Sequence, residues 1–303
     1  MTNIISSLTE YGIRFTENEA LSKYTSFKTG GCCRLMVKPV NIEEVKAVLS
    51  LLRASSYPFH IIGNGSNILA PDDPSDDIYI CTSEMSDISV SDTEDGGVIT
   101  AGSGAILAKV AYTAYTHGLT GLEFAHGIPG SLGGACVMNA GAYGGQMSDV
   151  VESTTYINAD GEVIIVRGDE HQFGYRKSVF TADDLITSST IKLTKGNPAE
   201  IKAKMEELAA KRRASQPLEF PSAGSTFKRP EGYFAGKLIE DAGLKGVTIG
   251  GAQVSTKHAG FIINIGNASS EDILKLISHV QDVVYKTSGV MLEPEVRIIG
   301  RTQ

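Results

Sequence analysis

Apolar residues recur at the spacing of an amphipathic helix in several stretches of this chain. One stretch begins at Asn41, which can form a capping box with Glu44, and its apolar face consists of Ile42, Val45, Leu49 and Leu52. Three more helices are expected at residues 106–118, 199–215 and 271–288. The helix at 199–215 is mostly polar, and its inward side consists of Ile201, Met205 and Leu208. The helix at 271–288 has capping signals at both ends: Ser269, Asp272 and Gly289.

Short runs rich in β-branched and aromatic residues predict strands between these helices. We expect strands at residues 59–62, 78–81 and 98–101, and a last one at 295–299. Residues 154–166 predict a β-hairpin, because the dipeptide Asp160-Gly161 separates two strand-like runs. Repeats and low-complexity tracts are absent from the sequence. With 303 residues, the chain is long enough for two or three domains, and we place boundaries near residues 80 and 215.

Overall composition is that of an ordinary soluble globular protein. The net charge of −8 argues against general nucleic-acid binding, although basic clusters such as 211–213 leave room for a small anionic substrate. No apolar run approaches the roughly 18 residues of a membrane span, and the N-terminus lacks a secretory signal pattern. The four cysteines have neither zinc nor Cys-x-x-Cys spacing, which is typical of a reducing cytoplasm, and we interpret Cys32 and Cys33 as packing residues.

Glycine is concentrated in the middle of the chain. Eleven of the 33 glycines fall within residues 102–145, and a further glycine-rich segment, 63–67, directly follows a predicted strand. Each segment alone could be a set of tight turns. Together they favour phosphate binding, because closely approaching backbone amides form an anion site. Common nucleotide motifs fit poorly: Ile68 replaces the third glycine of the dinucleotide fingerprint, and the segment 232–238 is one residue short of a P-loop. The six histidines show no zinc spacing, so we expect no metal.

Eight ordered segments identify the chain as resembling the UDP-N-acetylenolpyruvoylglucosamine reductase family of flavoenzymes, over about residues 24–300. They are "YTSFKTGG", "GNGSNIL", "TGLEFAHGIPGSLGGACVMNAGAYGG", "YRKS", "QPLEFPSAGSTFKRP", "AGKLIEDAGLKG", "VSTKHAGFIIN" and "LEPEVRIIG". The resemblance implies an α+β protein with a two-subdomain FAD-binding fold of the vanillyl-alcohol oxidase type and a C-terminal α/β substrate domain. On this basis we expect FAD subdomains at 1–80 and 81–215 and a substrate domain at 216–303, leaving open whether the last strand returns to the FAD domain.

The resemblance also implies roles for individual residues. The implied catalytic residues are Arg176, Ser225 and Glu295, with Glu293 as the alternative to Glu295. The expected FAD-binding residues are Gly63, Asn64, Gly65, Ser66, Asn67, Gly127, Ile128, Pro129, Gly130, Ser131, Gly133, Asn139, Gly141, Ala142 and Tyr175. The candidates for holding the substrate diphosphate are Arg213, Gln216, Lys228, Arg229, Lys237 and Lys257. Only 49 positions separate Arg176 from Ser225, which indicates the shorter form of the family, without the inserted loop that carries a substrate-clamping tyrosine.

The chemistry of the implied reaction explains these residue types. Hydride addition to the enolpyruvyl ether of UDP-N-acetylglucosamine places negative charge beside a carboxylate, and Arg176 offers a permanently charged fork for it. Ser225 would protonate the resulting carbanion, a far stronger base than an alkoxide, with Lys228 or water assisting. A charged Glu295 would repel the anion, so we expect it to be protonated or held by Arg176 in the reactive complex.

Further expectations concern the cosubstrate, location and rival functions. The resemblance implies NADPH as reductant, and we expect a cytoplasmic monomer that binds neither nucleic acid nor membrane. One alternative is an FAD-dependent sugar or alcohol oxidase of the same fold, for which His60 and His126 are the candidate sites of covalent flavin attachment. Another is a nucleotide-sugar-binding module without catalysis, which would be colourless.

Overall fold

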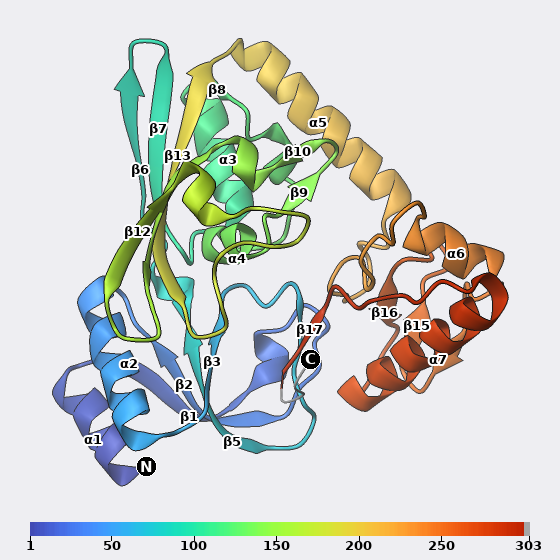
Figure 1. Ribbon diagram of the computed structural model, residues 1–303, viewed down its shortest axis with the longest axis horizontal. Coiled ribbons are helices and arrows are strands. Elements are labelled where there is room, and N and C mark those ends of the chain that lie inside the picture. The colour runs from blue at the N-terminus through green and yellow to red at the C-terminus, as the bar shows by residue number, and fades with distance from the viewer. Residues whose placement is uncertain (300–303) are drawn as a thin grey trace. The chain divides into compact units, whose positions relative to one another are not determined.

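The computed structural model describes residues 1–299, which divide into two compact units (Figure 1). Unit 1 consists of residues 1–17, 35–64 and 77–211; unit 2 consists of residues 18–34, 65–76 and the described residues from 212 onward. The last four residues of the expected substrate domain, 300–303, lie outside the described residues. The domain boundaries near residues 80 and 215 stay a prediction.

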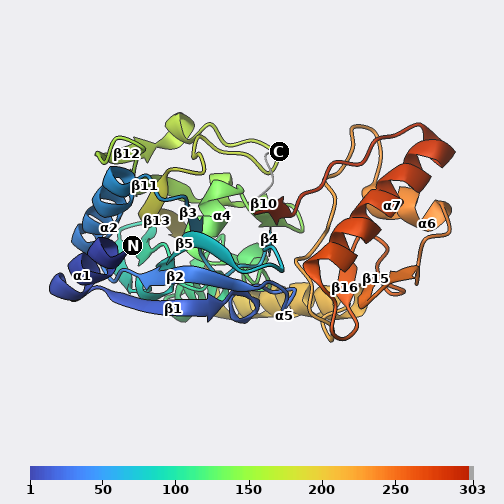
Figure 2. The ribbon, with the colours of Figure 1, turned by 90° about the horizontal axis from the view of Figure 1, so that it is seen from below.

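The first sheet has four strands in the order β1-β2-β5-β3. Its strands are β1 (Arg14–Ala20), β2 (Cys32–Lys38), β3 (Phe59–Ile62) and β5 (Ser75–Cys81). Two helices accompany it, α1 (Thr2–Glu10) and α2 (Ile42–Ser55), and their apolar faces share one core with the sheet (Figure 2). The Asn41 side chain accepts a hydrogen bond from the Glu44 amide, so α2 begins where the sequence predicts. β3 runs parallel to β5 and delivers the chain to Gly63.

The second sheet of unit 1 is antiparallel, with the order β12-β11-β13-β7-β6 and β8 paired to β13. Its strands are β6 (Ile88–Thr93), β7 (Gly96–Gly102), β8 (Leu119–Thr120), β11 (Val151–Ile157), β12 (Val163–Arg167) and β13 (Leu185–Lys195). Helices α3 (Leu107–Thr116) and α4 (Leu132–Val137) pack into its core, and the two short strands β9 (Gly141–Ala142) and β10 (Gly145–Gln146) form a separate pair. The expected hairpin is β11–β12, with Gly161 at φ 87° in its turn.

Unit 2 is built around a three-stranded antiparallel sheet of β14 (Thr248–Ile249), β15 (Ala252–Val254) and β16 (Ile262–Asn264). Helices α6 (Ala235–Asp241) and α7 (Ser270–Ser288) share its core. Ser269 and Asp272 form the predicted capping box of α7, and Gly289 ends the helix in the left-handed conformation. Two more short strands of this unit, β4 (Ile68–Leu69) and β17 (Arg297–Ile298), pair in parallel. α5 (Pro198–Ser215) contains the point at which the chain leaves unit 1.

Most of the expected elements are confirmed, and the mixed sheets and helices confirm the α+β class. The strand expected at 295–299 is wrong in extent, since only Arg297 and Ile298 pair with β4. Residues just before them have a different partner, because the Glu295 amide donates to the Thr226 carbonyl oxygen and Pro294 bridges to Phe227. Helix α6 and the short strands of the unit 2 sheet have no separate signal in the sequence, because they are too brief for periodicity to reveal.

Candidate active site

In unit 1 the start of the first glycine-rich loop, Gly63 and Asn64, lies against the second glycine-rich loop. The Asn64 side chain donates to the Pro129 carbonyl oxygen, which joins the loop after β3 to the loop before α4. Gly63 approaches so closely that a Cβ atom there would lie 2.1 Å from Ser131 Oγ. Glycine is therefore required at position 63 for space, because its backbone does not adopt the left-handed conformation. The sequence predicted both loops as ligand-binding segments, and the structure brings them together.

Several buried donors at these loops have no acceptor. The Gly130 and Ser131 amides donate to no atom of residues 1–299, although both residues are buried. The hydroxyls of Ser131 and Ser103 are also buried and, within the described residues, lack any hydrogen-bond partner. Native proteins almost always pair buried polar groups, so orphaned donors point to a bound acceptor. Such a cluster suits an anion, and the diphosphate of FAD fits it.

The first glycine loop continues into unit 2 at Gly65. Gly65 has φ 57°, and a Cβ there would lie 1.8 Å from the Tyr24 carbonyl oxygen, so both conformation and space require glycine. Asn67 then ties the loop to the C-terminal segment: its Nδ2 donates to the Glu295 carbonyl oxygen at 3.0 Å, and its own carbonyl oxygen accepts from the Arg297 amide. An expected cofactor loop and an expected catalytic residue therefore adjoin each other in unit 2.

Arg176 sits at a tight turn of unit 1. Gly174 and Lys177 exchange two backbone hydrogen bonds, leaving Tyr175 and Arg176 as the central pair of the turn. Arg176 has φ 55°, a left-handed conformation that costs a non-glycine residue on the order of 1 kcal/mol and that often marks functional residues. Its Nη2 donates to the Gly141 carbonyl oxygen at 3.3 Å, and Tyr175, 57% exposed, lies beside the guanidinium.

The Asn139 side chain holds this turn through a hydrogen bond to Gly174. Its side chain is buried, its Oδ1 accepts from the Ser148 amide at 2.9 Å, and its Nδ2 donates to the Gly174 carbonyl oxygen at 3.1 Å. Both ends of the carboxamide therefore bind backbone groups. Asn139 holds the Arg176 turn in addition to its predicted contact with FAD. Gly141 and Ala142 form the short strand β9 alongside it.

Ser225 and Glu295 are neighbours in unit 2. The chain around Ser225 runs antiparallel to the segment around Glu295: the Lys228 amide donates to the Glu293 carbonyl oxygen, and the Glu295 amide donates to the Thr226 carbonyl oxygen. This register sets Thr226 opposite Glu295 and Ser225 next to that pair. Ser225 is exposed, and within residues 1–299 its hydroxyl has no hydrogen-bond partner. An exposed hydroxyl without a protein partner is accessible to a substrate, as the proton-donor role requires.

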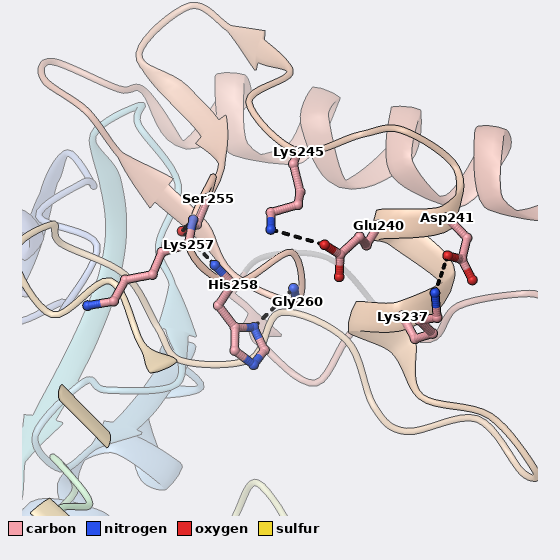
Figure 3. Close-up of polar contacts among 8 residues, drawn as sticks. All are labelled: Lys237, Glu240, Asp241, Lys245, Ser255, Lys257, His258 and Gly260. Atoms are coloured by element: carbon pink, nitrogen blue, oxygen red, sulfur yellow. Dashed lines mark hydrogen bonds and ion pairs between the residues drawn. The ribbon is translucent and has the colours of Figure 1, made fainter. Parts of the chain in front are cut away.

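All six candidates for substrate binding belong to unit 2, and most already have protein partners. Lys228 pairs with Glu293, and Lys237 pairs with Asp241, as Figure 3 shows for the latter. The exposed Lys237–Asp241 contact raises the pKa of Lys237.

The remaining candidates are held by backbone, side-chain or ring contacts. Lys257 Nζ donates to the Arg213 carbonyl oxygen at 2.7 Å, which places these two residues together. The Arg229 guanidinium lies 4.0 Å from the centre of the Phe234 ring, and Gln216 accepts from Arg212 Nε. Arg213 is exposed to solvent.

The expected catalytic residues are divided between the units. Arg176 belongs to unit 1 with most of the FAD candidates, whereas Ser225, Glu295 and the basic candidates belong to unit 2. Sequence reasoning missed Ser103, whose only signal is its place between two glycines at the end of β7. It also missed Thr226, because a buried threonine in a loop has no distinguishing pattern.

Cysteines and possible metal ligands are the other chemistry-bearing groups within residues 1–299. All four cysteines are free, and burial raises the pKa of the Cys33 and Cys136 thiols to about 11, which suppresses the reactive thiolate. In the described part of the chain, no three His, Cys, Asp or Glu side chains gather as a metal site would require. Nor does any helix among residues 1–299 combine the length and apolar character needed to cross a bilayer.

Comparisons with known proteins agree with this geometry. Residues 33–167 match a family model described as "FAD binding domain", and residues 216–299 match the C-terminal domain model of UDP-N-acetylenolpyruvoylglucosamine reductase. Enzymes of that name from Pediococcus pentosaceus and Limosilactobacillus fermentum are 48% and 45% identical, covering 95% and 99% of both chains. The crystal structure of the Thermus caldophilus enzyme is 33% identical, has a TM-score of 0.79, and covers 94% of this chain and 98% of its own. These matches confirm the predicted fold class.

Proposed function

Because the chain belongs to the UDP-N-acetylenolpyruvoylglucosamine reductase family, we propose that Arg176, Ser225 and Glu295 are its catalytic residues. The protein is an FAD-containing, NADPH-dependent oxidoreductase that reduces UDP-N-acetylglucosamine enolpyruvate to UDP-N-acetylmuramate, a step of peptidoglycan precursor synthesis. The observation that most directly supports the residue assignment is the exposed hydroxyl of Ser225, which has no hydrogen-bond partner within residues 1–299 and directly precedes Thr226, the residue whose backbone pairs with Glu295.

Two loops and one neighbouring serine would hold FAD in this assignment. The residues that would hold the diphosphate are Gly63 and Asn64, followed by Gly65 to Asn67, and Gly127 to Ser131 with Gly133. The buried hydroxyls of Ser103 and Ser131 supply two additional donors. When bound, FAD would supply the hydride chemistry that links NADPH to the substrate alkene. The protein's share is to orient the flavin and to keep water from the reacting carbon.

Arg176 stabilises the charge that develops during reduction. As the hydride adds to the terminal carbon, the neighbouring carbon and the carboxylate share two negative charges. A guanidinium remains protonated throughout and matches the planar carboxylate with two parallel hydrogen bonds. The turn at Gly174 and the contact with the Gly141 carbonyl oxygen hold the side chain before substrate arrives, so little reorganisation is needed at the transition state.

Ser225 supplies the proton that completes the reduction. Its hydroxyl passes a proton to the carbon next to the carboxylate, and water or a neighbouring cation returns one to the alkoxide. Lys228 is the nearest cation in sequence, but its ammonium is paired with the exposed Glu293, so it must exchange partners to assist. Glu295 acts beside Ser225, protonated or with its charge balanced by Arg176, since an unbalanced carboxylate would oppose the developing anion.

The UDP part of the substrate would bind to the basic residues of unit 2. We rank Arg213, Gln216 and Arg229 above the rest. Lys237 is already neutralised by Asp241, and Lys257 is directed to the Arg213 backbone. Arg229 is favoured because it is exposed, and the Phe234 ring that its guanidinium contacts is exposed as well. We further propose that the enzyme works as a cytoplasmic monomer, away from membranes and nucleic acid.

Half-reaction kinetics test these roles. NADPH should bleach the bound flavin under anaerobic conditions, and the enolpyruvyl UDP-sugar should restore its colour. Ser225→Ala should bleach normally but reoxidise more slowly by about 10²–10⁴-fold, because only the second half-reaction needs the proton. Unimpaired reoxidation in this variant would remove Ser225 from the mechanism. Release of the flavin on denaturation, without colour left on the chain, would further exclude an oxidase with flavin linked at His60 or His126.

A further inference from the structure

We propose that Thr226 is a positioning residue that fixes Ser225 beside Glu295, an inference that rests on the proposed roles of those two residues. Thr226 directly follows the proposed proton donor, Ser225, but the two residues differ in their exposure to solvent. Ser225 is exposed, whereas Thr226 is only 1% exposed. Ser225 itself has no hydrogen bond within residues 1–299, so its position depends on what holds its neighbours.

Three hydrogen bonds hold Thr226, each to a different part of unit 2. Its amide donates to the Gly260 carbonyl oxygen at 2.9 Å, and its carbonyl oxygen accepts from the Glu295 amide at 2.8 Å. Its hydroxyl oxygen accepts from the Ile262 amide at 3.0 Å. Thr226 therefore joins the segment before β16, the start of β16 and the C-terminal segment. A shift of this residue would move Ser225 and Glu295 relative to each other.

The segment that receives Thr226 is itself anchored. The Gly260 amide donates to His258 Nδ1 at 3.2 Å, and the amides of Lys257 and His258 both donate to Ser255 Oγ, as Figure 3 shows. The His258 ring packs edge-on against Phe261. These contacts hold residues 255–260 in one conformation. The hydrogen bond from the Thr226 amide to the Gly260 carbonyl oxygen therefore restrains the backbone next to Ser225.

The hydroxyl group explains why threonine occupies this position. Ile262 is only 1% exposed, so its amide has no water to replace a missing acceptor. Valine has the same branched shape without the oxygen, whereas serine keeps the oxygen and loses one methyl group. Thr226→Val and Thr226→Ser therefore separate the hydrogen bond from the packing of the side chain.

The test is the two half-reactions of the FAD-loaded variants. Thr226→Val should be bleached by NADPH within about twofold of the parent rate, because that step does not involve the Ser225 proton. Its reoxidation by the enolpyruvyl UDP-sugar should slow by about 10–100-fold, the effect of a small misplacement of a reacting group. The solvent deuterium isotope effect on reoxidation should rise as proton transfer becomes limiting. Thr226→Ser should restore the rate to within about threefold, since the acceptor is kept.

Val284→Ala provides the control for general loss of stability. Val284 is fully buried in α7, and its truncation should lower the thermal midpoint by about 2–4 °C, comparable to Thr226→Val, with both half-reactions kept. Equal slowing of both half-reactions in Thr226→Val, or reoxidation as fast as in Val284→Ala, would refute the positioning role. Failure of the parent enzyme to be reoxidised by this substrate would instead refute the proposed function, so the two failures are distinguishable.

Discussion

The contact between Gly63 and Ser131 gives the sharpest test of how the glycine loops serve the cofactor. A methyl group at position 63 would lie 2.1 Å from Ser131 Oγ and 3.3 Å from Ser131 Cβ. The first distance is well inside van der Waals contact, whereas the second is tight but tolerable. Overpacking of this kind costs about 1–3 kcal/mol, so Gly63→Ala should lower the free energy of unfolding by that amount. It should also weaken FAD binding, because Ser131 must move.

Removing the serine hydroxyl should have opposite effects on folding and on binding. Ser131 Oγ is buried and, within the described residues, has no partner, so Ser131→Ala should leave the unloaded protein as stable as the parent or up to about 2 kcal/mol more stable. FAD affinity should nevertheless fall about 10–100-fold, the effect of one lost hydrogen bond to a charged group. The double variant Gly63→Ala/Ser131→Ala should recover most of the stability lost by Gly63→Ala, because the clashing atom is gone.

Urea unfolding of the FAD-free protein and titration of FAD by its fluorescence measure the two quantities. Gly134→Ala is the matched control, since its methyl group would lie at an ordinary 3.4 Å from the same hydroxyl oxygen. This variant should keep its FAD affinity and, as a helix position in α4, lose no stability. Unchanged FAD affinity in Ser131→Ala, or a double variant no more stable than Gly63→Ala, would refute this reading of the loops.

Three other variants test the surroundings of the site. Arg176→Lys keeps the charge but loses the fork, so substrate reoxidation should slow at least about 10²-fold while NADPH bleaching continues. Asn139→Ala removes the acceptor of the Ser148 amide, and should cost about 1–3 kcal/mol in urea unfolding and slow reoxidation. Burial lowers the pKa of His258 below its ordinary 6.5, so the folded state prefers the neutral ring. Stability should be full above about pH 6.5 and fall as pH drops toward the lowered pKa; an equal decline in His258→Gln would contradict this.

Local sequence determined the elements that are defined by neighbouring residues. Asn41 with Glu44 begins α2, and Ser269 with Asp272 begins α7, because a capping hydrogen bond spans only three positions. The glycine loops could also be predicted, since a high glycine content indicates that the backbone closely approaches a ligand or a neighbouring segment. The ordered motifs then identified the family, and with it the proposal that Arg176, Ser225 and Glu295 are catalytic, although spacing alone could not assign their chemistry.

Tertiary structure decided what depends on residues far apart in the chain. β17 is two residues long because Glu295 pairs with Thr226, about 70 positions earlier, while Arg297 and Ile298 pair with β4. Two further features also depend on distant residues: the burial of the Ser103 hydroxyl, which has no hydrogen-bond partner within residues 1–299, and the ion pair between Lys228 and Glu293. Periodicity reports which face of an element is apolar, but not which distant backbone or charge meets it. Only the folded chain brings those partners to within hydrogen-bond distance.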